Sequence, residues 1–227
     1  MLIRPLGNIM AIITGGINGG FIGKAGSVVG YCQHGKWVMR GLPRLSPKNK
    51  KGSVDQNICR SKFSKMQYFL GPILPFIRIG FNLEAKRKGN TAHNSAKSWN
   101  MLNAFDENGE INYSAVRVSS GNLPGAADVA VETNGNELVF SWRDNSNEVP
   151  NPEHTGLREI DQVMLLAYNS QFNVIRFVMS GARRSAGREV LNIGWSKPGL
   201  EVHTWISFIA DDRQSIANST YAGIVVF

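Results

Sequence analysis

The sequence predicts an α+β protein that is mainly β. We expect a Gly-rich N-terminal arm with a β-hairpin and two helices, then an antiparallel β-sandwich of immunoglobulin or fibronectin-III type. Glycines crowd the first 43 residues, helical periods follow as far as residue 105, and short alternating runs recur after residue 106. The expected domains are the arm at 1–26, a basic hairpin with helices at 27–106 and the sandwich at 107–227.

The N-terminal region joins a glycine-rich lead-in to a strand–turn–strand pattern. Residues 10–26 indicate a glycine-rich lead-in, because glycine frees the backbone, and Gly15–Gly26 within it is expected to be an arm that is mobile or becomes ordered against another subunit. Ser27–Gln33 and Lys36–Leu42 are strand-like and meet at His34-Gly35, where glycine can supply the positive φ of a tight turn. A basic linker with two prolines follows at residues 43–52.

The first expected helix begins after Ser53, which forms a capping box with Gln56, and ends near Leu70 before a Gly-Pro pair. Spacings of four, three and four predict one buried stripe along it: Cys59, Phe63, Met66 and Leu70. Cys32 and Cys59 are too few for a disulfide framework, so buried free thiols are expected.

A second expected helix begins after Asn90 or Thr91 and runs to about Phe105. Its buried stripe is predicted from the same kind of spacing: Ala92, Ala96, Trp99 and Leu102. Between the two helices, residues 72–81 indicate an irregular or short helical segment, and residues 84–90 a charged turn.

The C-terminal part has the pattern of a β-sandwich. Residues 111–120 alternate as a strand does, and two further alternating runs flank Asn134-Gly135, a strong hairpin signal. Five more strand-like runs follow, at about 161–169, 174–181, 188–194, 201–210 and 219–227. The Cys…Trp…Cys pattern of antibody domains is missing, whereas a fibronectin-like sandwich fits.

Charge is unevenly divided along the chain. Residues 1–100 hold 16 Lys and Arg against two acidic residues, and residues 101–227 hold nine against 15. A basic half favours nucleic acid or another acidic partner. No run reaches the length of a membrane span, and the N-terminal apolar patch lacks the pattern of a signal peptide, so a cytoplasmic protein is expected, with incorporation into a virion or other particle as a further option.

No catalytic, metal or cofactor site is expected. The four histidines lack the spacing of zinc ligands, and Gly23-Lys24 is followed by Ala25, where a phosphate-binding loop needs Ser or Thr before a helix. The sequence also shows no nucleophile with a nearby base. We therefore expect a protein that is not an enzyme.

The candidate contact residues are basic side chains with interleaved aromatic residues, since cations can meet phosphates and rings can stack on bases. They are Lys24, Tyr31, Lys36, Trp37, Arg40, Arg44, Lys48, Lys50, Lys51, Lys62 and Lys65. Alternation in the hairpin puts Lys36, Val38 and Arg40 on one face and Trp37 and Met39 on the other. The alternative is that Trp37 fills a core and the cations are solvated.

Several motifs resemble an uncharacterised family of Bacteroidota genomes, mobile elements and phages, known only as a domain of unknown function. They are GGFIGKAGSVVGY, GKWVMRGLP, RSKFSKMQYFLGPILPFIRIGF, LPGAA at 123–127, FSW at 140–142, the turn at 180–187 and NSTYAG at 218–223. The resemblance covers the chain from about Met10. It implies a Gly-rich hairpin and helices before a β-sandwich, and no catalytic residue.

Three functions follow as hypotheses. The first is a non-enzymatic structural or assembly protein, such as a phage-type particle subunit, that contacts itself or another assembly protein through the arm and hairpin. The second is a nucleic-acid-binding protein that uses the basic N-terminal half. The third is carbohydrate or surface adhesion by sandwich loops such as residues 144–157.

Overall fold

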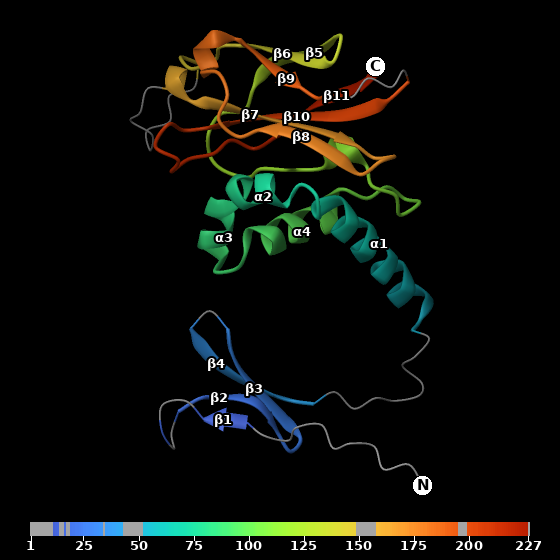
Figure 1. Cartoon of the computed structure of the whole chain (residues 1–227), viewed down its shortest axis with the longest axis vertical. Helices are drawn as coiled ribbons and strands as arrows, with labels where there is room; N and C mark the ends of the chain where they lie inside the picture. Colours follow the sequence, from blue (N-terminus) through green and yellow to red (C-terminus); the bar gives the residue numbers. More distant parts are fainter. Residues whose placement is uncertain are drawn as a thin grey trace. The chain divides into compact units, whose positions relative to one another are not determined.

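The computed structural model describes residues 11–13, 16, 19–33, 35–42, 52–148, 158–194 and 199–226. The chain divides into two compact units, Met1–Ser53 and Val54–Phe227 (Figure 1). The sequence instead suggested boundaries near residues 26 and 106. The helices after residue 53 and the sandwich share one apolar core, which explains why they form a single unit.

The N-terminal unit contains one antiparallel sheet in the order β1-β2-β3-β4. Its strands are β1 (Ala11–Ile13), β2 (Phe21–Ala25), β3 (Val28–Gln33) and β4 (Lys36–Gly41). The predicted hairpin is confirmed, with Gln33 paired to Lys36 and Gly35 at φ 75°. A second tight turn places Gly26 at φ 57° between β2 and β3.

The stretch Gly15–Gly26 was expected to be a mobile or partner-ordered arm, and its described residues include strand β2 instead. The register explains why glycine is needed there. Gly23 pairs with Gly30, and a Cβ on Gly30 would lie 2.6 Å from the ring of Phe21. The glycines therefore let the aromatic side chain of β2 lie flat on β3, as close packing requires.

Four helices follow, where the sequence suggested two. They are α1 (Val54–Leu70), α2 (Leu74–Gly80), α3 (Asn82–Lys88) and α4 (Ala92–Asn103). Residues 84–90 were expected to form a charged turn, but most of them belong to helix α3. Ion pairs from Glu84 to Arg87 and Lys88 along one face stabilise this helix. The predicted cap of α4 is confirmed: the Thr91 hydroxyl accepts a hydrogen bond from the Asn94 amide at 3.2 Å.

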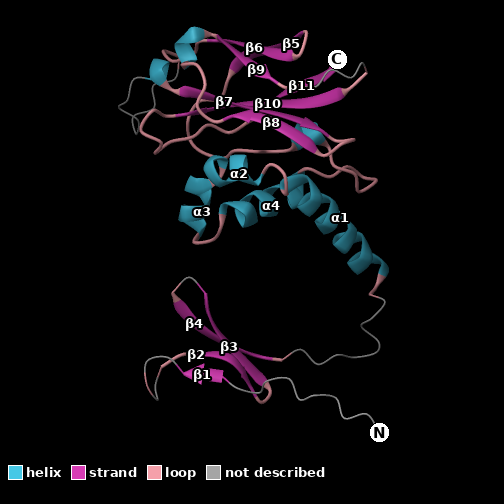
Figure 2. Ribbon diagram, in the orientation of Figure 1, coloured by secondary structure: helices cyan, strands magenta, loops and turns pink. Residues whose placement is uncertain are grey.

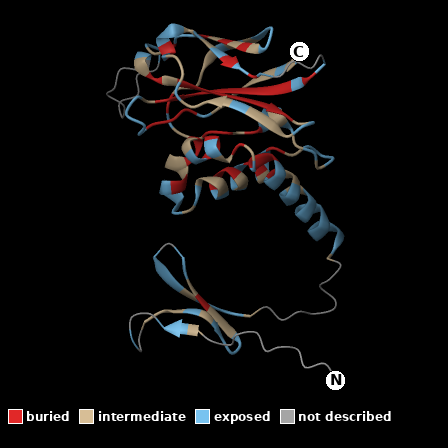
Figure 3. Cartoon of the chain, in the orientation of Figure 1, coloured by how far each residue is buried: buried red, intermediate tan, exposed pale blue. Residues whose placement is uncertain are grey.

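The predicted stripe of α1 is only half correct. Met66 and Leu70 are fully buried, whereas Phe63 is 49% exposed and Cys59 is exposed. Only the C-terminal half of α1 packs against the rest of the second unit, and its N-terminal half projects away from that unit (Figure 3). Cys32 is exposed as well, so the expectation of two buried thiols was wrong.

The stripe predicted for α4 is also shifted. Ala96 is buried, but Leu102 is 84% exposed, and the buried neighbours of Ala96 are Ser95 and Asn100. The Asn100 side chain explains the difference: it donates to the Arg117 carbonyl and accepts from the Arg117 amide, both at 2.9 Å. Asn100 can therefore be buried although it is polar, because the backbone of Arg117 satisfies its side-chain amide.

The sandwich has two antiparallel sheets, in the orders β5-β6-β9 and β11-β10-β7-β8 (Figure 2). Its strands are β5 (Ala127–Asn134), β6 (Glu137–Arg143), β7 (Gln162–Asn169), β8 (Val174–Val178), β9 (Arg188–Asn192), β10 (Glu201–Ile209) and β11 (Thr220–Val226). The chain is therefore mainly β with an immunoglobulin/fibronectin-III-like sandwich, as predicted.

Two predicted details of the sandwich differ. The β5–β6 turn is Gly135-Asn136, one residue later than expected, with Gly135 at φ 59°. The expected strand at 111–120 contains the short 3-10 helix Tyr113–Ala115, because the Asn112 side chain accepts from the Ser114 amide and turns the backbone.

Two apolar clusters hold the second unit together as three layers. One cluster lies between the sheets and includes Phe140, Leu165 and Phe208. The other fills the space between the helices and the opposite face of β7 and β10, and includes Phe69 and Trp205. The helices cover this face (Figure 1), so β7 and β10 are buried on both sides at nearly every position.

Candidate interaction surface

The charged residues of the four described strands in the N-terminal unit all lie on one face of the sheet, which also exposes Ile12 and Ile22. Cys32 pairs with Trp37, Gly30 with Met39, and Ile13 with Phe21, and paired residues of an antiparallel sheet share a face. The face so defined has no charged residue in the described strands. We call it the uncharged face: Ala11, Ile13, Phe21, Gly23, Ala25, Val28, Gly30, Cys32, Trp37, Met39 and Gly41.

The large side chains of the uncharged face are open to solvent. Ile13 is 59% exposed, Met39 66% and Trp37 48%, and Gly30 is the only buried residue among those described in this unit. Trp37 lies across Gly20, where a Cβ would overlap the indole ring. An apolar surface of this kind is typical of a contact site, since soluble proteins expose few contiguous apolar patches.

The opposite face is basic. It carries Lys24, Tyr31, Lys36 and Arg40, and Val29 pairs with both Lys24 and Arg40 across the sheet. Two strand spacings therefore separate Lys24 from Arg40, about 10 Å. The structure brings these four predicted contact residues together and places Trp37 on the other side of the sheet.

The other predicted contact residues fall into two groups. Arg44, Lys48, Lys50 and Lys51 lie outside the described residues, as does most of the loop 144–157. Lys62 and Lys65 belong to α1 in the second unit and have intramolecular partners. Lys65 pairs with Glu110 and donates to the Gly109 carbonyl, and the Lys62 ammonium lies 5.3 Å from the centre of the Phe105 ring.

The two units differ in net charge. Residues 1–53 contain eight Lys and Arg and no acidic residue, and residues 54–227 contain 17 of each sign. The net charge of +8 thus resides in the unit that carries the basic face. Within the second unit the helical part is basic and the sandwich is acidic.

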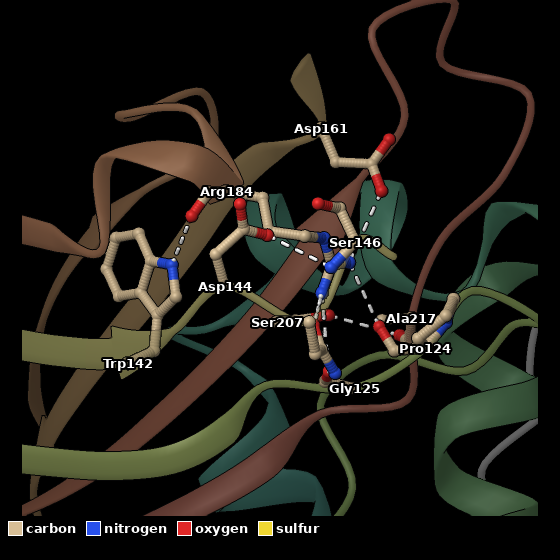
Figure 4. A network of polar contacts seen from close by, with 10 residues as sticks. Pro124, Gly125, Trp142, Asp144, Ser146, Asp161, Arg184, Ser207 and Ala217 are labelled. Atoms are coloured by element: carbon tan, nitrogen blue, oxygen red, sulfur yellow. Dashed lines mark hydrogen bonds and ion pairs between the residues drawn. The ribbon is translucent and has the colours of Figure 1, made fainter. Parts of the chain in front are cut away.

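A buried polar network in the sandwich had no signal in the sequence. The Arg184 guanidinium is fully buried and donates to the Pro124 carbonyl at 3.0 Å and to the Gly125 carbonyl and Asp161 Oδ2 at 3.3 Å each (Figure 4). It also donates to Asn145 Oδ1 at 2.8 Å. It also lies 3.8 Å from the centre of the Phe208 ring. These partners all belong to the sandwich itself, so the network ties the sheets together.

A second buried polar side chain is His203 on β10. Its ring stacks on Tyr113 with centroids 3.9 Å apart, and Nδ1 lies 2.9 Å from the Tyr221 hydroxyl. Burial lowers the pKa of His203 to about 4, so the imidazole is neutral at pH 7. Burial also raises the pKa of Tyr168, which packs beside it against Phe69.

Neither network has the ligand set of a metal centre. No group of three or more His, Cys, Asp or Glu side chains that could hold a metal occurs in the described part of the chain. Among the same residues, no helix combines the length and apolar character needed to cross a membrane.

A family of unknown function, DUF6266, matches residues 20–223. The chain belongs to this family. The resemblance to a domain of unknown function is thereby confirmed, and the DUF6266 match spans both the glycine-rich sheet and the sandwich. No curated protein matches the chain.

Among solved structures, the chain is similar to the fn3 domain of human collagen alpha-1(XX) chain. The identity is 11%, the TM-score is 0.31, and the alignment covers 48% of this chain and 87% of the other. So distant a likeness carries no functional information. The assignment of the sandwich comes from its own strand order.

Proposed function

We propose that this chain is a non-enzymatic structural or assembly protein, such as a phage-type particle subunit, whose N-terminal sheet packs on a neighbouring subunit. One observation carries the proposal: the uncharged face exposes Ile13, Trp37 and Met39 on a sheet with a single layer. A sheet needs a second layer to bury an apolar face, and isolated strands are marginally stable in water.

The charge distribution supports contact between unlike parts of two subunits. The N-terminal unit has a net charge of +8, and residues 101–227 carry six more acidic than basic residues. Opposite charges of this size favour a head-to-tail arrangement, in which one surface meets a different surface of the next copy. Contacts of that kind form rings or filaments.

Sedimentation and light scattering of the full chain at several salt concentrations test this proposal. We expect higher assemblies near 50 mM salt and smaller species as salt screens the charges. Trp37→Thr with Met39→Thr should abolish assembly, because threonine retains strand propensity and removes most of the apolar area.

The matched control is Val38→Thr on the opposite face of the same strand, which should assemble as the unsubstituted chain does. A chain that stays monomeric at its highest soluble concentration and low salt would refute the proposal. Equal assembly of the Trp37→Thr/Met39→Thr variant and the control would exclude the uncharged face as the contact.

The basic face favours a second candidate function, binding of a polyanion such as nucleic acid. Lys24, Lys36 and Arg40 project from one face beside Tyr31, a combination found where proteins hold a phosphate backbone. Each neutralised phosphate on duplex DNA lowers the slope of log K against log salt by about 0.9, so three cations predict a slope between about −2 and −3.

Fluorescence anisotropy with labelled single-stranded and duplex oligonucleotides measures this slope. Lys36→Glu with Arg40→Glu should weaken binding strongly, and Lys86→Glu on α3 is the control at an exposed lysine of the other unit. Absence of binding near 50 mM salt would exclude this function.

A further inference from the structure

A cavity of about 390 Å³ opens on the second unit between the helical layer and the sandwich. Its helical side is formed by the end of α2 and the start of α3, and its sandwich side by the segment after β8 and the β10–β11 connection. The volume lies within the range of small-molecule sites. The proposals above make no use of this cavity.

The interior of the cavity is apolar and belongs to the core. Ile209 and Ile216 are 2% exposed each and form a backbone bridge with one another. Leu83 and Met179 line the walls and pack against the helix–sheet cluster. Residues held this firmly make a pre-formed site, so a ligand would bind without a large ordering cost.

Two arginines, Arg78 and Arg213, line the same cavity. Arg78 lies in the last turn of α2, and its side chain makes no hydrogen bond or ion pair with any described residue. Arg213 donates to the Met179 carbonyl at 3.2 Å and to both Ser180 Oγ and Gln162 Oε1 at 2.7 Å, and no described carboxylate pairs with it. Both cations therefore lack an acidic partner in the described part of the chain.

The backbone of Arg213 is in an unusual conformation. Its φ is 60°, in the left-handed region that non-glycine residues rarely adopt, and its amide donates to the Ala210 carbonyl at 2.9 Å. The preceding Asp212 carboxylate accepts from the Gln214 amide within the loop. The tight turn thus fixes the position of Arg213 at the cavity, at a cost in backbone strain that often accompanies binding sites.

We infer that this cavity binds a small amphipathic anion, a molecule with an apolar body and one carboxylate or phosphate head group. The isoleucine floor would cover the apolar body, and the two guanidinium groups would meet the head group. Arginine presents planar pairs of N–H donors that match both head groups. A neutral ligand of the same shape would leave the two cations without a counter-ion.

The test is an NMR titration of the full, isotope-labelled chain with decanoate and with decyl phosphate, using decanamide as the neutral comparison. We expect amide shifts at cavity residues such as Leu83 and Ile216, with at least one anion binding about tenfold more tightly than decanamide. The better of the two anions identifies the head group.

Arg78→Gln is the main variant for this test. The Arg78 side chain has no hydrogen bond or ion pair with a described residue, so the substitution should leave folding unchanged. We expect it to weaken anion binding about tenfold, and Arg213→Gln to do at least as much. Arg87→Gln is the matched control, since Arg87 pairs with Glu84 on α3 and does not line the cavity.

Four results would overturn the inference. They are no binding of either anion, equal binding of decanamide, equal affinities of the Arg78→Gln and Arg87→Gln variants, or amide shifts confined to the uncharged face of the N-terminal sheet. Assembly through that sheet is measured separately, so either proposal can fail alone.

Discussion

Replacing Arg184 by methionine tests the structural account most directly. Methionine keeps the length and apolar contact of the side chain but removes every donor of the guanidinium. Four groups lose a charged donor: the Pro124 and Gly125 carbonyls, Asn145 Oδ1 and the Asp161 carboxylate. The contact with the Phe208 ring becomes one between neutral groups.

The expected magnitude follows from burial. Arg184 is 0% exposed and Asp161 is 3% exposed, so water cannot replace the lost partner without opening the sandwich. Removing one member of a buried ion pair costs about 3–5 kcal/mol, because the other charge stays buried. For a chain of this size, that loss lowers the melting temperature by roughly 6–20 °C.

Urea unfolding of the full chain, followed by tryptophan fluorescence and far-UV circular dichroism, measures the change. Arg183→Met is the matched control at the neighbouring exposed arginine and should change the free energy of unfolding by less than about 0.5 kcal/mol. If Arg184→Met cost less than about 1 kcal/mol, the view that this network ties the sheets together would be refuted.

Two further changes test other contacts. His203 has a pKa of about 4 when folded and 6.5 as a free side chain, so its contribution should be intact above pH 6.5 and lost as pH falls to about 4, by at most about 3 kcal/mol. Between pH 7 and pH 4, the free energy of unfolding in urea should fall less for the His203→Gln variant than for the unsubstituted chain. An equal fall for both proteins would contradict this account. Gly121→Ala should cost about 1–3 kcal/mol in thermal unfolding, because its Cβ would lie 2.8 Å from the Ile216 carbonyl carbon, while Gly125→Ala, whose nearest neighbour is at 3.5 Å, should be close to neutral.

The sandwich was predictable because its strands carry local signals. Residues 127–143 alternate around a turn that contains glycine, and that pattern fixes a hairpin whatever the rest of the chain does. The same holds for Ser27–Leu42, whose turn needs only Gly35. Such hairpins depend on the residues of their own turn and strands, so they can be predicted from the sequence.

The contact residues and internal networks were harder to predict because they depend on long-range pairing. Alternation separated Trp37 from Lys36 and Arg40, but only the register with β2 shows that Lys24 joins the basic side. Arg184 cannot be told from Arg183 in the sequence, because its carbonyl partners lie some 60 positions earlier. The cavity with Arg78 and Arg213 likewise joins residues far apart in the chain.

The double-sided burial of β7 and β10 has a consequence for dissecting this protein. A chain cut at residue 107 would keep all seven strands of the sandwich and lose the helices over Met164, Tyr168 and Trp205. That sheet would then present aromatic side chains to water, and such a fragment should precipitate or self-associate. The smallest fragment with a covered core therefore begins before α1, and the helices are as much a part of the sandwich as its strands.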